Sequence, residues 1–181
     1  MHQHPITTRQ AYHNEPKFQV QHVQYWGSTS NTSSCGAKLY PPVIAKGRPA
    51  GTTEDDIPYL FATAILLDAE GNPVPEQLGG SFSAAAVGLD EQRRSSSSTG
   101  HPVAFMFPDL NIAYEGTYSI RVDVYRVDYV SGQGAILVDQ VETRMFAVCD
   151  ADVPCQRPSS DERSVLRKLR DQGYSVPSSP A

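Results

Sequence analysis

Hydrophobic and polar residues alternate most regularly in the second half of the chain. From position 118 the apolar side chains are Tyr118, Ile120, Val122 and Val124, and the intervening ones are Ser119, Arg121, Asp123 and Tyr125. Successive residues of a strand point to opposite faces, so this pattern predicts a strand with one apolar and one polar face. A turn with two glycines at 131–134 leads to the segment 136–148, which we expect to return as a second long strand of an antiparallel hairpin.

Shorter segments predict further strands. Residues 18–22 alternate, Val43-Ile44 follows the stiff pair Pro41-Pro42, and segments 59–67 and 103–107 are compact apolar runs. We expect the 59–67 strand to be buried on most sides. The segment 78–87 is rich in Gly, Ala and Ser, which is typical of a strand that another segment approaches closely. We expect loops at 27–34, 46–58 and 88–100.

One helix is expected near the end of the chain. Ser159 and Glu162 have the spacing of a capping box, and Gly173 stands where a helix stop belongs. Between them Val165, Leu166 and Leu169 form one apolar stripe. Short strands followed by one helix predict a mostly β fold, an immunoglobulin-type β-sandwich with one C-terminal helix.

Length and composition bound the organisation. A chain of 181 residues fits one domain, and 14 Pro and 13 Gly favour a loop-rich β protein. We expect a flexible N-terminal tail at 1–16, the domain at 17–177 and a C-terminal tail at 178–181. The first residues lack the apolar core of a signal peptide, and no apolar run is long enough for a membrane helix. Three Cys without a C-x-x-C argue against a disulfide scaffold, so we expect an intracellular protein.

The charge is unevenly distributed. The net charge is −5, yet residues 1–50 hold five basic residues and one acidic residue, and the remainder holds ten basic and nineteen acidic residues. A positively charged N-terminal segment can steer a protein toward phosphate groups. The alternative interpretation is that residues 1–50 are a solvated, weakly basic tail. The predicted helix carries Arg163, Arg167, Lys168 and Arg170. This second basic face fits contact with phosphate or an acidic partner, or simply cations that favour the helix dipole.

Known catalytic motifs are absent. The sequence contains no G-x-S-x-G, H-E-x-x-H, Walker or G-x-G-x-x-G motif. Asp109 follows a proline and is expected to hold its own turn rather than act as a base. The run 54–56 is expected to be solvated loop, Cys149 and Cys155 to pack, and His2 and His4 not to bind metal. We therefore expect a binding protein with no enzymatic activity, cofactor, metal or small-molecule substrate.

Three stretches resemble the velvet domain of fungal regulators. The densest match is Phe105-Met106-Phe107-Pro108-Asp109-Leu110 followed by Glu115-Gly116-Thr117-Tyr118 and the alternating strand. The segment 59–68 with Leu78-Gly79-Gly80 is similar to the early core strand of the family and the start of the next one. Residues 166–176 resemble its closing helix, and the whole likeness spans roughly 18–176.

The resemblance implies a Rel-homology-like sandwich that binds DNA through N-terminal loops and forms homo- or heterodimers with other velvet proteins. It implies a nuclear transcription regulator, able to shuttle with the cytoplasm, that controls fungal development, sporulation and secondary metabolism. The first loop of the family is dense in Arg and Lys, whereas here only Lys38 lies between Cys35-Gly36 and Pro41-Pro42. The best candidates for DNA contact are Lys38, Lys46 and Arg48. The alternatives are a dimerisation partner with weakened DNA binding and, from another class, a sandwich module that binds a ligand.

Overall fold

The computed structural model describes residues 18–21, 36, 38–49, 51–89, 100–129, 132, 134–149 and 158–176. The expected tails at 1–16 and 178–181 lie outside the described residues, as do His2, His4, Cys155 and most of the loops expected at 27–34 and 88–100.

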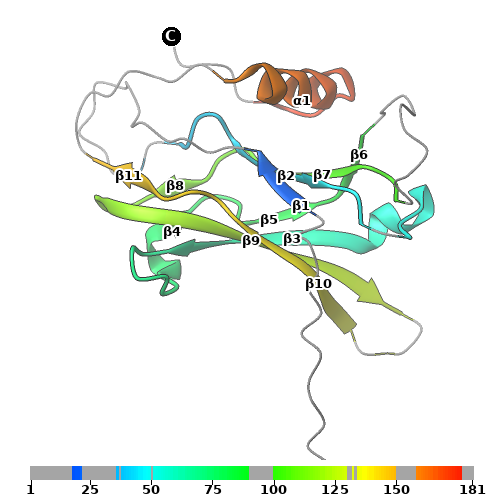
Figure 1. Cartoon of the computed structure of the whole chain (residues 1–181), viewed down its shortest axis with the longest axis horizontal. Helices are drawn as coiled ribbons and strands as arrows, with labels where there is room; N and C mark the ends of the chain where they lie inside the picture. Colours follow the sequence, from blue (N-terminus) through cyan, green and yellow to red (C-terminus); the bar gives the residue numbers. More distant parts are fainter. Residues whose placement is uncertain are drawn as a thin grey trace, which may run out of the picture.

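Two antiparallel sheets contain most of the strands of the described chain (Figure 1). The strands of the first sheet, in spatial order, are β1 (Phe18–Gln21), β2 (Val43–Gly47), β7 (Val103–Phe107) and β6 (Val87–Gly88). Those of the second are β10 (Gly134–Glu142), β9 (Gly116–Asp128), β3 (Leu60–Leu67) and β5 (Ser83–Ala85), with β11 (Phe146–Val148) also paired to β9. A small separate ladder joins β4 (Leu78–Gly79) to β8 (Asn111–Ile112).

The two sheets face each other across one hydrophobic core. The core is built by alternate residues of facing strands, such as Val43 and Phe105 on one side and Leu66 and Ile120 on the other, all at most 3% exposed. Burial of this apolar surface is the main force that holds the two sheets together. The described part of the chain is therefore mostly β with antiparallel sheets, as the alternation predicts.

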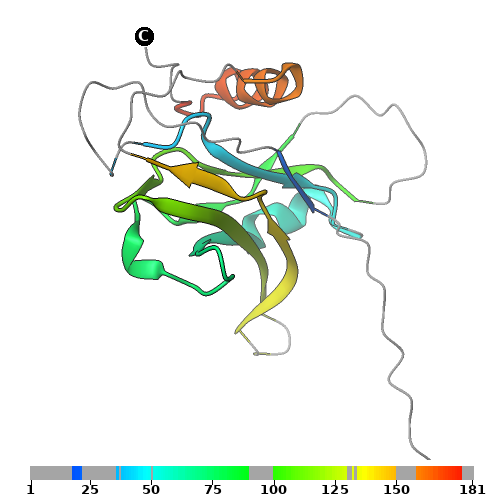
Figure 2. The same ribbon diagram turned by 60° about the vertical axis from the view of Figure 1, so that its left-hand side comes forward.

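The helix α1 (Ser160–Asp171) lies on the outer side of the first sheet (Figure 2). Its stripe of Val165, Leu166 and Leu169 packs against Ile44 of β2 and Ala104 of β7. The predicted capping box is confirmed, because the Glu162 carboxylate accepts from the Ser159 N–H at 2.6 Å and the Ser159 hydroxyl accepts from the Glu162 N–H at 3.3 Å. The helix, first sheet and second sheet form three successive layers.

The helix ends as its sequence predicts. Gly173 has a φ of 86°, which only glycine adopts readily. The Tyr174 N–H donates to the Leu169 carbonyl at 3.0 Å and the Gly173 N–H to the Arg170 carbonyl at 2.9 Å, which together form a Schellman motif. The Gln172 amide then donates to the Gly88 carbonyl at 2.9 Å and ties the helix end to β6.

Several predicted segments differ from the structure. The single strand expected at 78–87 is three short strands in three different sheets, and 136–148 is divided into β10 and β11. The loop expected at 46–58 contains the end of β2 and a 3-10 helix, η1 (Glu54–Tyr59). A second 3-10 helix, η2 (Pro75–Gln77), precedes β4. The strand β3 is buried on alternate residues rather than on most sides.

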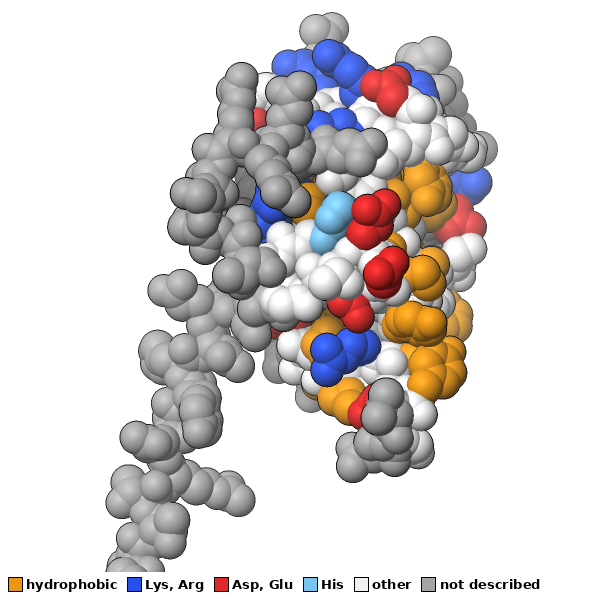
Figure 3. Space-filling view, turned by 90° about the vertical axis from the view of Figure 1, so that its right-hand side faces the viewer, with side chains coloured by type: hydrophobic (Ala, Val, Ile, Leu, Met, Phe, Trp, Pro, Cys, Tyr) orange, Lys and Arg blue, Asp and Glu red, His pale blue; other side chains and the backbone are white. Residues whose placement is uncertain are grey.

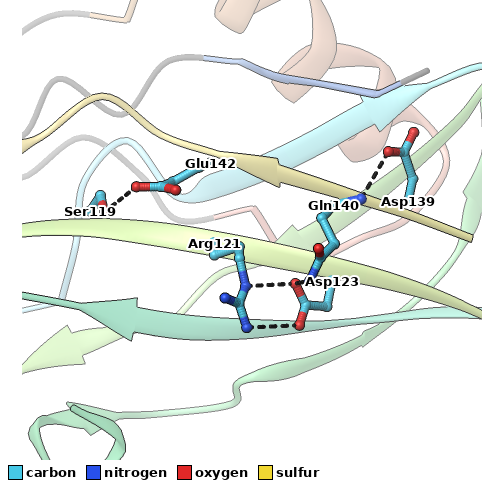
Figure 4. A network of polar contacts seen from close by, with 6 residues as sticks. All are labelled: Ser119, Arg121, Asp123, Asp139, Gln140 and Glu142. Carbon is cyan, nitrogen blue, oxygen red and sulfur yellow. Dashed lines mark hydrogen bonds and ion pairs between the residues drawn. The ribbon is translucent and has the colours of Figure 1, made fainter. Parts of the chain in front are cut away.

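Other predicted strands are confirmed. The strand at 103–107 matches β7, the 18–22 alternation contains β1, and the 118–125 alternation lies within β9. The polar face of β9 is less exposed than expected, because Ser119 and Asp123 are also buried. Their burial follows from the polar partners that β10 supplies on the same face (Figure 4).

Tyr118 anchors the entrance to β9. Its hydroxyl oxygen lies 2.7 Å from Oε1 of Gln77 and 3.1 Å and 3.3 Å from the carbonyl oxygens of Glu115 and Tyr114. The ring lies against Gly116, where a Cβ would be 2.7 Å from the hydroxyl oxygen. The tyrosine therefore fixes the backbone that leads into the longest strand.

Candidate nucleic-acid interface

Lys46 lies on the outer face of the first sheet, the face on which α1 packs, and Arg48 follows it. Residues 43 to 48 alternate between the two faces of the first sheet, and Val43 and Ala45 enter the core between the sheets. Ile44 is on the other face, under α1, and Lys46 follows it on that face, opposite Ala104, which α1 also covers. Both cations are partly buried, and Arg48 continues the same alternation just beyond the strand end.

The backbone around Arg48 is tightly held. Its guanidinium Nη1 donates to the Gly100 carbonyl at 3.4 Å, and the His101 N–H donates to the Thr52 carbonyl at 2.8 Å. Gly100 is packed so closely that a Cβ would overlap the Pro49 carbonyl oxygen. Arg48 is thus placed where the end of β2 meets the segment that leads into β7.

The helix α1 adds the second basic group on the same side of the first sheet. Arg163, Arg167 and Arg170 are exposed and Lys168 is half-buried, while the apolar stripe faces the sheet. One of the three acids of the helix, Glu162, is buried in the capping box. Figure 3 shows Lys and Arg side chains gathered at the top of the molecule, on the helix side. The three arginines of the helix are therefore exposed, away from its apolar stripe.

Lys38 lies at the other end of the first sheet. Lys38 forms an isolated β-bridge with Asn111, beyond the end of the β2–β7 ladder where Val43 pairs with Phe107. Arg48 follows the opposite end of that ladder. The five residues of β2 separate these ends by about 13 Å. Lys38 is exposed, and its charge helps lower the pKa of Asp109. This neighbouring carboxylate offsets part of the charge that Lys38 could present to phosphate.

The predicted site residues therefore form two groups. Lys46, Arg48 and the cations of α1 lie on the helix side of the first sheet, and Lys38 stands apart beside an acid. Cations on one surface add their attraction for phosphate, which is the largest contribution to non-specific affinity for DNA. The helix-bearing layer is the stronger candidate of the two.

Asp109 has a different role from the one expected. Its carboxylate accepts from the backbone N–H of Ser81 at 2.9 Å and from the Ser81 hydroxyl at 3.0 Å, so it binds a distant loop instead of only its own turn. The Ser81 N–H is the main reason that the pKa of Asp109 is below its ordinary value. Gly80 has a φ of 89°, and a Cβ there would overlap the Asp109 carbonyl oxygen.

The acidic run at 54–56 is also more ordered than expected. Asp56 closes a capping box at the start of η1, where its carboxylate accepts from both the N–H and the hydroxyl of Thr53 at 2.7 Å. The Thr53 N–H is the largest cause of the lowered pKa of Asp56. The signal that could have revealed this is the T-x-x-D spacing, which belongs to the same class as the box that begins α1.

A polar network on the second sheet was not foreseen (Figure 4). Arg121 makes a bidentate pair with Asp123, with Nε–Oδ1 at 2.9 Å and Nη2–Oδ2 at 3.2 Å, and the Gln140 amide donates to the same Oδ1 at 2.9 Å. The Ser119 hydroxyl lies 2.6 Å from Oε1 of Glu142. These contacts satisfy the buried carboxylate of Asp123 and bind β9 to β10.

Other features limit the chemistry of the described residues. No group of three or more His, Cys, Asp or Glu side chains there is arranged to hold a metal ion. Cys149 is exposed, so the expectation that it packs in the protein is wrong. None of the helices in the described ranges is long and apolar enough to span a membrane.

Comparison with known proteins gives no relative. A scan against protein-family models finds no match to this chain, and a search of curated proteins finds none.

Proposed function

We propose that this protein is a velvet-type transcription regulator that binds DNA through the helix-bearing layer and dimerises with velvet-family proteins. Lys46, Arg48 and the exposed arginines of α1 make the phosphate contacts. The protein acts in the nucleus, with shuttling through the cytoplasm, and controls fungal development, sporulation and secondary metabolism. The observation that carries the DNA-binding part is the location of two sequence-distant basic groups on the same side of the first sheet, the side that carries α1.

The strand order supports an immunoglobulin-like, Rel-homology-like sandwich. Immunoglobulin domains have one sheet in the order A-B-E-D and a second that contains C, F and G. In chain order, β1-β2-β7-β6 corresponds to A-B-E-D, and β10-β9-β3 corresponds to G-F-C. The contact of Tyr118 with the carbonyl oxygen three residues upstream has the form of the tyrosine corner at the start of strand F.

The velvet assignment rests on the sequence likeness and is supported by where the similar segments lie. The loop after Leu78-Gly79-Gly80 is hydrogen-bonded to Asp109 of the Phe107-Pro108-Asp109-Leu110 stretch. Two separate segments of the resemblance are thus neighbours in space. Contacts between them give a physical reason for the two glycines and the aspartate to occur together.

The alternative is a velvet-like dimerisation partner with weakened DNA binding. It is favoured by the position of Lys38, the one cation of the expected first loop, beside Asp109. In that case a partner supplies the phosphate contacts that this chain lacks.

The test is a salt titration of DNA binding by the full chain. Each lost phosphate contact should reduce the slope of log K against log salt by about 0.9. Lys46→Ala with Arg48→Ala, and Arg167→Ala with Arg170→Ala, should each weaken binding and flatten this dependence. Arg144→Ala is the control, because Arg144 is exposed between β10 and β11 on the second sheet.

The possible outcomes separate the two candidates. Loss of binding in both pairs, with Arg144→Ala unchanged, supports the direct regulator. Weakening by Lys38→Ala alone would move the interface to the opposite end of β2. No binding at low salt without a velvet partner would support the dimerisation subunit, and secretion of the tagged protein by its host cell would exclude both.

A further inference from the structure

Four aromatic side chains gather on the outer face of the second sheet, the face that points away from the first sheet and α1. The rings of Phe61 on β3 and Tyr125 on β9 stack with centroids 5.2 Å apart. Tyr59 and Tyr129 make an edge-to-face contact with centroids 5.3 Å apart, yet they remain 43% and 72% exposed. We call these four residues the aromatic platform.

The two pairs of rings are neighbours along the strands. Only Leu60, which is extended and points into the core, separates Tyr59 from Phe61, so the pairs are about 7 Å apart. Leu137 of β10 lies opposite Tyr125 and is 46% exposed, which widens the platform by one strand. Exposed apolar side chains that form a contiguous patch mark an interaction site.

The surroundings of the aromatic platform are acidic. The strands of the second sheet and η1, which ends at Tyr59, together carry seven acidic and two basic residues. Two of the acids, Glu54 and Asp55, are exposed on η1, and one of the bases, Arg121, is paired with an acid of its own strand. Figure 3 shows acidic side chains beside hydrophobic ones. This surface therefore attracts a cationic partner and repels phosphate.

We propose that the aromatic platform binds a proline-rich segment of another protein that carries Lys or Arg. Proline-rich segments form a polyproline II helix, and this preformed conformation docks on aromatic side chains at a small cost in entropy. One turn of the helix is about 9 Å long, so it reaches across both pairs of rings. The Lys or Arg residues beside the prolines then meet the carboxylates of η1 and the ring of Tyr129.

The size of the aromatic platform fits a peptide better than a folded partner. An aromatic side chain offers about 200 Å² of surface, so the exposed parts of Tyr59, Tyr129 and Leu137 present about 300 Å². A standard interface between folded proteins buries about 800 Å² per partner. The neighbouring strand β5 has only three residues and adds little to this area. A short extended segment is the occupant that such an area suits.

This inference goes beyond the proposed function, because α1 and its cations lie on the other sheet. A peptide bound to the second sheet leaves those cations accessible. Peptide binding and DNA binding are therefore separable, and either one can fail alone.

The test begins with an array of synthetic twelve-residue peptides that is probed with the purified full chain. Each peptide has a Pro-x-x-Pro core and two Arg residues outside it, and its other positions vary. In two matched arrays, either both Arg residues are replaced by Glu or the prolines are replaced by Ala. We expect binding only where both features are present, with dissociation constants that rise with salt concentration.

Variants of the platform then locate the site. Tyr59→Ser with Tyr129→Ser should raise the dissociation constant of the best peptide at least about tenfold, because aromatic anchors dominate such interfaces. The matched control is Tyr114→Ser with Tyr174→Ser, which removes two tyrosines that are 64% and 42% exposed elsewhere. This control should leave the dissociation constant unchanged.

Charge variants test the acidic surroundings. Glu54→Gln with Asp55→Asn should weaken peptide binding about threefold at low salt and should flatten its salt dependence, because two exposed ion pairs are lost. Asp161→Asn with Asp171→Asn is the control, since these two acids are exposed on α1. The control should change neither the affinity nor the salt dependence.

A footprint on the unmutated chain makes the test independent of how the variants fold. Bound peptide should protect Tyr129 and Leu137 from hydroxyl radicals and leave Tyr114 and Tyr174 unchanged. The proposal is overturned if no peptide binds better than both of its matched versions, or if the peptide protects α1 instead. A dimer of the full chain that Tyr129→Ser dissociates also overturns it, because a second copy then occupies the platform.

Discussion

The carboxylate of Asp109 receives two hydrogen bonds from Ser81, one from its backbone N–H at 2.9 Å and one from its hydroxyl at 3.0 Å. Asp109 follows β7 of the first sheet, and Ser81 precedes β5 of the second. A single side chain thus links the connections of both sheets at one end of the molecule.

Asp109→Asn should lower the free energy of unfolding by about 1 kcal/mol, because it removes the charge that strengthens both hydrogen bonds. Urea denaturation of the variant and the parent measures the difference. Glu70→Gln is the control, since Glu70 is exposed in a turn, and it should have no measurable effect. Equal stability of Asp109→Asn and the parent would contradict the role assigned to this contact.

Stability should fall in acid through the same carboxylates. The pKa values of Asp109, Asp56 and Asp68 are all lowered, mainly by the backbone N–H groups of Ser81, Thr53 and Asn72 respectively. A carboxyl with a lowered folded-state pKa stabilises the fold above its ordinary pKa of 3.8, and this stabilisation is lost as the pH falls through the folded-state value. Unfolding followed from neutral pH into acid should show this loss, and Asp109→Asn should make the curve flatter.

Gly80→Ala should be strongly destabilising, by about 3 kcal/mol, because both its φ of 89° and the contact with Asp109 exclude a side chain. Gly71→Ala is an informative comparison. Gly71 also has a positive φ, 82°, but open space surrounds it, so only the backbone strain of about 1 kcal/mol should appear. Thermal and urea unfolding measure both, and similar losses would mean that the close approach of Asp109 is not important.

Tyr118→Phe should cost about 1–2 kcal/mol, because it removes the hydroxyl that bonds Gln77 and the backbone at the start of β9 while the ring still fills its place. Tyr114→Phe changes an exposed hydroxyl four residues earlier and should be nearly neutral. Equilibrium unfolding of the two variants separates them. A neutral Tyr118→Phe would also weaken the case for an immunoglobulin-like tyrosine corner.

Ser159→Ala should destabilise the helix layer by about 1 kcal/mol through loss of the N-cap. Ser164→Ala, at an exposed position of the same helix, should be neutral or slightly stabilising because alanine favours helix. Far-ultraviolet circular dichroism during urea unfolding gives both values. If α1 carries the proposed DNA contacts, Ser159→Ala should also weaken DNA binding in conditions where the helix begins to unfold.

The sequence by itself determined the strands and the helix whose patterns lie within a short stretch of neighbouring residues. The alternation of β9, the apolar run of β7 and the cap, stripe and glycine stop of α1 lie within short segments, so all three elements could be predicted, β7 and α1 with nearly correct bounds and β9 without its two ends. Helix caps and strand alternation depend on neighbours a few residues away, which one sequence displays directly.

Only the tertiary structure decided which strands pair and which side chains meet. The segment 78–87 was divided because Leu78, Ala84 and Val87 find partners in Ile112, Ala62 and Ala104, which belong to three different sheets. In the same way, Lys46 was placed on the layer of α1 and Lys38 beside Asp109. Hydrogen bonds and apolar contacts between residues far apart in the chain fix these positions, and such contacts leave no periodic signal in the sequence of either segment.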